Sequence, residues 1–196
     1  MPSVIYTRLQ NNITQLVAQF RDFNRVDASL PPNQIKLRAL ISLIHAEFET
    51  YFEQVGNYII DFFQNGTMTT TQSATIKGSI LCYGNKSYEG GLESYFDRIN
   101  SNVLQLKSII SSNNGIKEKD ILKIILPLSF PVSLLDQTWL NTINSFGSLR
   151  GELIHRNLNQ ISRVIGYDYF DAIISTIVIP GINPIDQYFV TNFNLP

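Results

Sequence analysis

A single apolar stripe in the first third of the chain most limits what this sequence can fold into. It follows the turn signal Pro31-Pro32-Asn33 and repeats every three or four residues, at Leu37, Leu40, Ile41, Ile44, Phe48, Tyr51, Phe52, Val55, Ile59, Phe62 and Phe63. Such spacing is typical of one buried helix face. At 1.5 Å per residue it predicts a helix roughly 40–45 Å long, ended by Asn65-Gly66.

Shorter segments with helical spacing surround this long helix in the sequence. We expect further helices over 4–23, 92–110, 117–126, 136–155 and the stretch beyond Gly166. Asp136 is suited to cap the helix that carries Trp139. The prediction is an all-α protein, a single domain over 1–196 with a four-helix up-and-down core at about 35–160.

Two stretches break the helical pattern. Residues 66–91 are rich in Thr, Ser and Gly, and we interpret them as a polar insertion. This insertion is either a short hairpin turned at Gly84-Asn85 or a flexible loop. Near the end of the sequence, Pro180, Gly181 and Pro184 are expected to interrupt regular structure.

Composition excludes several classes of function. The 196 residues are 44% hydrophobic and 16% charged, which suits one globular domain that folds without a metal or disulfide. A net charge of −1 removes any global basic field, so a nucleic-acid partner must be held by a local patch. One cysteine and two histidines exclude a disulfide framework and a cysteine-rich zinc site. We therefore expect no cofactor and no metal.

The chain shows no targeting or membrane signal. Its N-terminal residues lack the basic start and apolar run of a secretory signal. The most apolar stretch, 121–130, contains Lys123 and Pro127 and is too short to span a bilayer. We expect a cytoplasmic protein that has no membrane partner.

One constellation could carry chemistry. In the segment Arg150-Gly-Glu-Leu-Ile-His155, arginine and histidine stand five positions apart, about 140° around a helix. A histidine can exchange a proton with an RNA 2′-hydroxyl or a leaving 5′-oxygen. An arginine can hold the phosphate and neutralise charge in the transition state. The alternative is structural: Arg150 pairs with Glu152 or another carboxylate, and His155 interacts with the helix dipole.

Three stretches together resemble a known superfamily: the motif ending in His155, the preceding pattern Leu140-x2-Ile143-x5-Leu149, and His45-Ala-Glu-Phe-Glu49. They are similar to HEPN proteins, small α-helical proteins of bacterial toxin–antitoxin, phage-defence and CRISPR-associated systems. The stretch at His45 is similar to standalone branches such as the RiboL-PSP and MAE_28990-like groups.

The resemblance implies a homodimer with a composite, metal-independent endoribonuclease site at the interface. Arg150 would then bind phosphate, and His155 would be the general acid/base. Arg156, Asn157 and Arg163 would contact the RNA substrate. It also implies an antitoxin or a defence-complex protein as a candidate partner.

This chain departs from the superfamily pattern at two positions. Active members usually carry a polar residue directly after the arginine, whereas this chain has Gly151. That glycine either allows a partner backbone to approach closely or marks a degenerate site. Members regulated by a nucleotidyltransferase carry a tyrosine where this chain has Asn157, so regulation by that route is not expected.

Carboxylates of the long helix are candidate structural partners of the motif. We expect Glu47 or Glu49 to reach Arg150 and so tie the two helices together. His45 and Glu49 are one turn apart and could pair within the helix. A metal site built from His45 and two carboxylates is the weaker interpretation, since no further histidine or cysteine cluster supports it.

Three functions remain open at this point. The leading one is a metal-independent endoribonuclease of a toxin–antitoxin or phage-defence system. The alternative is a catalytically inactive HEPN-fold module for dimerisation and for RNA or protein binding. The third is an unrelated helical scaffold in which the motif is a coincidence.

Overall fold

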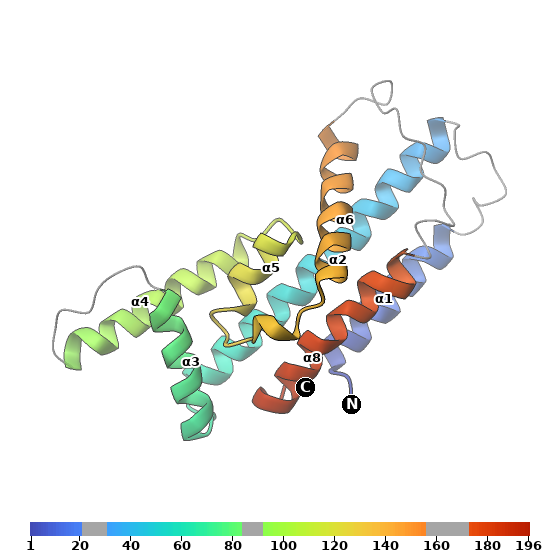
Figure 1. The fold of residues 1–196 in the computed structure, drawn as a ribbon. Coiled ribbons are helices and arrows are strands. Elements are labelled where there is room, and N and C mark those ends of the chain that lie inside the picture. Colours follow the sequence, from blue (N-terminus) through green and yellow to red (C-terminus); the bar gives the residue numbers. More distant parts are fainter. Residues whose placement is uncertain (21–30, 84–91, 156–172) are drawn as a thin grey trace.

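The computed structural model describes residues 1–20, 31–83, 92–155 and 173–196. All regular structure in these ranges is helical, which confirms the all-α prediction (Figure 1). The elements are α1 (Val4–Phe20), α2 (Pro31–Gln64), α3 (Thr70–Tyr83), α4 (Leu92–Ser111), α5 (Glu118–Ile125), the short 3-10 helix η2 (Val132–Leu134), α6 (Gln137–His155), the π-helical segment η4 (Ile174–Val178) and α8 (Ile179–Phe193).

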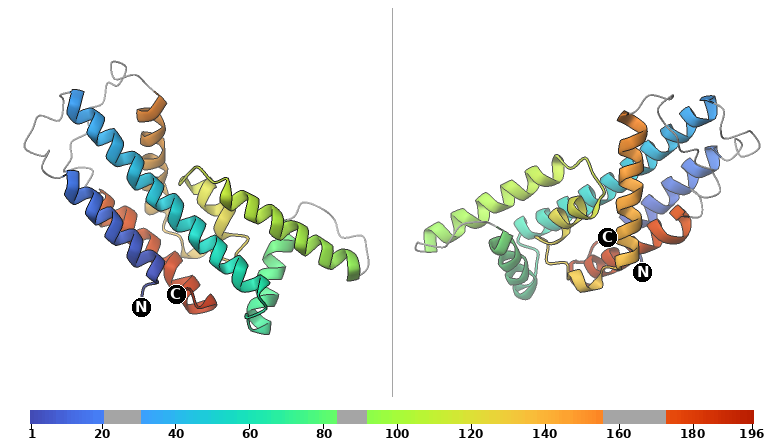
Figure 2. Two further views of the ribbon diagram at one scale, coloured as in Figure 1. Left: turned by 180° about the vertical axis from the view of Figure 1, so that it is seen from behind. Right: turned by 45° about the horizontal axis from the view of Figure 1, so that its top comes forward.

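The long helix α2 runs through the centre of the molecule, and the other helices are arranged along it (Figures 1 and 2). Helix α1 runs antiparallel beside its first half, and α8 lies next to α1. Helix α6 crosses α2 on another side, whereas α3, α4 and α5 gather around its C-terminal half. Both ends of the described chain lie close together, where the Val4 N–H donates to the carbonyl of Pro196.

The predicted stripe of α2 forms the centre of the core. From Leu37 to Ile59 its side chains are all buried, with exposed fractions of 6% or less, and Phe62 and Phe63 are partly buried. Gly66 follows the helix with φ of +68°, a left-handed conformation that glycine adopts without strain. The long-helix prediction is therefore confirmed.

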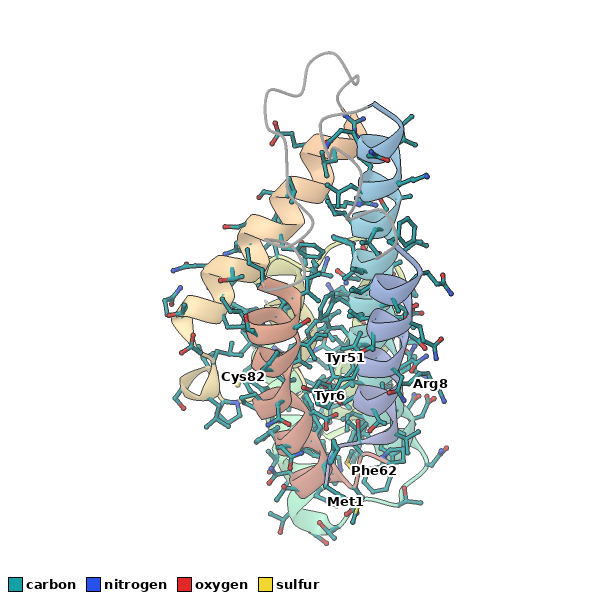
Figure 3. All side chains as sticks on the ribbon, turned by 90° about the vertical axis from the view of Figure 1, so that its right-hand side faces the viewer. Met1, Tyr6, Arg8, Tyr51, Phe62 and Cys82 are labelled. Atoms are coloured by element: carbon teal, nitrogen blue, oxygen red, sulfur yellow. The ribbon has the colours of Figure 1, made fainter. Side chains whose placement is uncertain are left out.

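A buried carboxylate joins the two ends of the chain to α2. Asp186 of α8 is fully buried and accepts three hydrogen bonds. The donors are the Ser3 backbone N–H (2.8 Å), the Ser3 hydroxyl and the Tyr51 hydroxyl (3.3 Å). Ser3 Oγ also accepts from the Tyr6 N–H at 2.9 Å and so caps α1. Figure 3 shows Tyr6 and Tyr51 together between α1, α2 and α8.

Residues 70–83 form helix α3, so the hairpin or loop expected there is wrong. A capping box starts this helix: the Thr69 N–H donates to Gln72 Oε1 at 2.8 Å, and the Gln72 N–H donates to Thr69 Oγ1 at 3.3 Å. Only Ile76 and Ile80 are buried on it. With so few apolar positions among threonines and serines, the helical period was weak in the sequence. The proposed turn at Gly84-Asn85 lies outside the described residues.

The expected break at Pro180, Gly181 and Pro184 is also wrong, because all three residues lie in α8. Pro180 stands in the first turn, where a backbone N–H has no partner within the helix. Pro184 lies further inside and removes one helical hydrogen bond. The helix persists because it buries an apolar face made of Ile179, Ile182, Ile185, Phe189 and Phe193.

The beginning of α6 docks on this C-terminal segment. Trp139 is buried, and its indole N–H donates to the carbonyl of Val178 at 3.1 Å. The ring lies so close to Gly181 that a Cβ atom there would be 1.9 Å from Trp139 Cδ1. Gly181 is thus required by close packing. No helix in the described ranges is long and apolar enough to cross a membrane.

We expect Gly181→Ala to destabilise the protein although alanine favours helices. The added methyl group overlaps Trp139, and such overpacking costs about 1–3 kcal/mol in the free energy of unfolding. Gly78→Ala in α3 is the matched control, since no described atom lies within 4 Å of its Cβ position, and it should stabilise by up to about 1 kcal/mol. Urea unfolding measures both; a neutral Gly181→Ala would contradict the packing argument.

A second expectation concerns alkaline pH. Burial, followed by the charge of Asp186, raises the pKa of Tyr6 from 10.0 to about 12. In the unfolded chain the phenol loses its proton at lower pH, so stability is unaffected below about pH 10 and falls as the pH rises towards 12. Tyr6→Phe should flatten this fall in the urea midpoint. The same variant measured near neutral pH accounts for its lost hydrogen bond to Ile179 O; an unchanged slope would contradict the assignment.

Candidate functional site

Helix α6 carries the motif and is fixed at its first turn. Asp136 caps it as predicted, with the Trp139 N–H donating to Asp136 Oδ1 at 2.7 Å. One face of the helix is buried through Trp139, Leu140, Ile143, Phe146 and Leu153. Asn144 joins it to α5, because Asn144 Oδ1 accepts from the Glu118 N–H at 2.8 Å. The apolar contacts predicted for this helix are therefore confirmed for the side chains that the structure describes.

The crossing of α6 and α2 is centred on aromatic contacts. The Phe146 ring lies 6.4 Å from the His45 ring and 6.2 Å from the Phe48 ring, measured between centroids. The two helices run in opposite directions and separate beyond this crossing, towards the C-terminal end of α6 (Figures 1 and 2). The end that carries Arg150 and His155 thus projects away from the main core.

Arg150 lies one turn beyond Phe146. It is half-buried, and its Nε atom is buried without a hydrogen-bond partner among the described residues. Leaving a buried donor unpaired costs about 1–3 kcal/mol. A guanidinium group presents five donors in a planar fork that matches a phosphate or carboxylate. Arg150 is therefore suited to bind an anion that approaches the end of α6.

Gly151 follows Arg150 in an open position. No described atom lies within 4 Å of the point where a Cβ atom would stand. Packing within the described part of the protomer does not require glycine here, in contrast to Gly181. This leaves both sequence interpretations of Gly151 open.

The other motif residues are only partly described. His155 is the last residue of α6, and its backbone is helical, but its side chain lies outside the described part of the structure. Arg156, Asn157 and Arg163 also lie outside the described residues. Their roles as acid/base and as RNA contacts stay predictions.

The expected tie between Glu47 or Glu49 and Arg150 is not present. Glu47 lies on the α1 side of α2, where its Oε2 accepts a hydrogen bond from Asn12 Nδ2 at 2.8 Å. Glu49 lies 3.3 Å from His45 Nδ1, which confirms the intrahelical pair. No ion pair joins either carboxylate to Arg150 among the residues described. The helical positions explain this difference, because residues 47 and 49 are about 200° apart around α2.

His45 is almost completely buried, with 3% of its surface exposed, and it packs on Phe146. The weaker interpretation of this residue was a metal site. In the described ranges, no group of three or more histidine, cysteine and acidic side chains is arranged to hold a metal ion. The position of His45 instead relates it to the packing of α2 against α6.

Sequence reasoning overlooked Arg38, which lies on the same side of α2 as His45. The signal was available in the spacing, because residues seven apart lie on one face of a helix. Arg38 is half-buried. It received no attention because it precedes the stretch that resembles HEPN proteins.

Double-mutant cycles test the corrected partners. The effects of Glu47→Ala and Arg150→Ala on the free energy of unfolding should add within about 0.5 kcal/mol, because the two side chains have no shared contact. Glu47→Ala and Asn12→Ala should show a coupling of at least about 0.5 kcal/mol, since their side chains are hydrogen-bonded. Coupling between Glu47 and Arg150 would restore the tie expected from the sequence.

Comparison with known proteins now adds the family. The sequence profile of the RiboL-PSP-HEPN family matches residues 7–179. No curated protein and no solved structure matches the chain. The profile covers α1 to the end of the π-helical segment and includes the whole Arg150–His155 motif. This match excludes an unrelated scaffold, and the chain belongs to the RiboL-PSP-HEPN family.

Proposed function

We propose that this protein is a metal-independent endoribonuclease whose site is completed by a second copy of the chain. The observation that carries the proposal is Arg150, a half-buried arginine in an Arg-x4-His motif whose Nε has no partner among the described residues. It stands on the part of α6 that projects beyond the crossing with α2. Membership of a HEPN family supports RNA as the substrate.

The reaction needs one proton acceptor, one proton donor and positive charge beside the phosphate. The 2′-oxygen of the RNA attacks the adjacent phosphorus, and the bond from phosphorus to the 5′-oxygen breaks, which leaves a 2′,3′-cyclic phosphate. His155 takes the 2′-hydroxyl proton or protonates the leaving 5′-oxygen. Arg150 binds the phosphate oxygens and stabilises the charge that develops on them. Arg156, Asn157 and Arg163 hold the strand on either side.

Self-association has support on the outer face of α2. Ile35 and Leu43, two turns apart on this face, expose 53% and 44% of their surface. Apolar side chains on an open helix face favour contact with another protein surface. The open position at Gly151 would also admit a partner backbone near the motif. We propose a homodimer that brings the two α6 ends together.

The biological setting follows from the resemblance to toxin–antitoxin and phage-defence proteins. An RNA-cleaving enzyme in the cytoplasm must be restrained until it is needed. An antitoxin or a protein of a defence complex would supply that restraint. We therefore propose such a protein as a second partner beside the RNA.

A second candidate function is a HEPN-fold module that dimerises and binds RNA or protein without cleaving RNA. Gly151 favours this candidate, because active members of the superfamily usually place a polar residue after the arginine. A glycine contributes no side chain that could orient the phosphate or the water around it. RNA binding through Arg150 would remain.

Cleavage in the presence of a chelator tests the leading proposal. We expect the purified protein to cut single-stranded RNA in excess EDTA and to leave 2′,3′-cyclic phosphate ends. His155→Ala should reduce the rate by about 10²–10⁴-fold, the usual contribution of a general acid/base. Lys119→Ala, at an exposed position of α5, is the control and should cleave normally. Product ends are identified by mass spectrometry.

Two results would contradict the proposal. Equal cleavage by wild type and His155→Ala would remove His155 from the reaction. Intact RNA with a folded wild-type protein that still binds RNA would favour the non-catalytic module.

A further inference from the structure

A row of polar side chains runs along α2 beside α6. Arg38, Ser42, His45 and Glu49 follow one another at intervals of four, three and four residues and therefore share one helix face. His45 is buried and the other three are half-buried. Within the row, the Ser42 hydroxyl donates to the Arg38 carbonyl at 2.9 Å, and His45 lies 3.3 Å from Glu49.

This α2 row faces α6, because the His45 ring packs against the Phe146 ring. The two helices run in opposite directions from that contact. On α6, the direction towards its C-terminal end leads to Arg150, four residues beyond Phe146. On α2, the same direction leads to Arg38, seven residues before His45. The two arginines thus lie on the same side of the crossing, on helix faces turned to each other.

The carboxylates near this side of the crossing are directed elsewhere. Glu49 lies on the opposite side of the contact and is paired with His45. Glu47 is turned to α1 and bonded to Asn12. Glu152 follows Arg150 by two residues and lies roughly 200° away around α6. Two arginines on facing helices repel each other, and an anion between them removes that cost.

We propose that Arg38 binds a phosphate of the RNA strand beside the phosphate held by Arg150. This inference rests on the proposed function insofar as RNA is taken as the partner. The two arginines come from different helices that diverge beyond their crossing, so they suit successive phosphates of one extended strand. Phosphate neutralisation by arginine releases counterions from the strand and adds salt-dependent affinity. Arg38 is an RNA-binding residue here and takes no part in the proton transfers.

The salt dependence of RNA binding tests the proposal without any need for cleavage. The probe is a fluorescent single-stranded RNA with 2′-O-methyl groups, which cannot attack the phosphate. Anisotropy titrations over a range of KCl concentrations give the slope of log Kobs against log[KCl]. Removing one phosphate contact to a single strand lowers the magnitude of this slope by about 0.7. A change in stability alone would not alter the slope.

Three variants separate a phosphate contact from other effects. We expect Arg38→Gln to lower the slope by about 0.7 and to weaken binding most at low salt. Arg38→Lys keeps the charge and should retain the slope. Lys36→Gln removes one positive charge from the same helix, about 200° from Arg38, and should leave the slope unchanged. Thermal melting confirms that each variant is folded.

The possible results also separate this inference from the proposed function. An unchanged slope in Arg38→Gln would overturn the inference, and so would an equal loss in Lys36→Gln. If wild type cleaves unmodified RNA while Arg38→Gln keeps the slope, only the inference fails. If the slope depends on Arg38 and wild type never cleaves RNA, the inference holds and the nuclease proposal fails. No RNA binding by wild type would overturn both.

Discussion

Burial of one face of α2 is the constraint on which the rest of this structure depends. The helix is 34 residues long, and its stripe from Leu37 to Ile59 is shielded from water by helices that contact different parts of its length. Because one face must be covered, the flanks of that face become the borders with α1 and α6. Glu47 marks the α1 border, and His45 marks the α6 border.

The position of the motif follows from how α6 is held. Its beginning is fixed by Trp139, which packs on Gly181 and donates to the carbonyl of Val178. That C-terminal segment is itself held to α1 and α2 through Asp186, Ser3 and Tyr51. The middle of α6 rests on α2 at Phe146. Only the last turns, which carry Arg150 and His155, extend beyond these contacts and become accessible to RNA or a second copy.

Much of the fold could be predicted because its helices are strongly amphipathic. The stripe of α2 and the Asp136 cap of α6 were visible in the sequence, and the structure has both. Helix α3 was not predicted, because its two buried isoleucines give almost no period among polar residues. Helix α8 was not predicted, because the apolar face that stabilises it outweighs the local effect of Pro184, and local rules do not include tertiary packing.

The candidate site shows a similar division. Arg150 and His155 were found from a short motif, which needs no knowledge of packing. The partners of Glu47 and Glu49 depend on which helices cover each side of α2, and the sequence does not contain that information in readable form. The contact between His45 and Phe146 supplies it, and that contact also relates Arg38 to Arg150. Three-dimensional placement thus added a residue to the site and removed the carboxylates proposed for it.

The claim that two copies build one cleavage site is tested most directly by mixing subunits. Arg150→Ala and His155→Ala proteins are each assayed on single-stranded RNA, and then together after their subunits have exchanged. A mixed dimer retains one Arg150 and one His155 on different subunits, so the mixture should cleave RNA although each variant alone is impaired. A mixture no more active than its separate components would contradict a site shared between two copies.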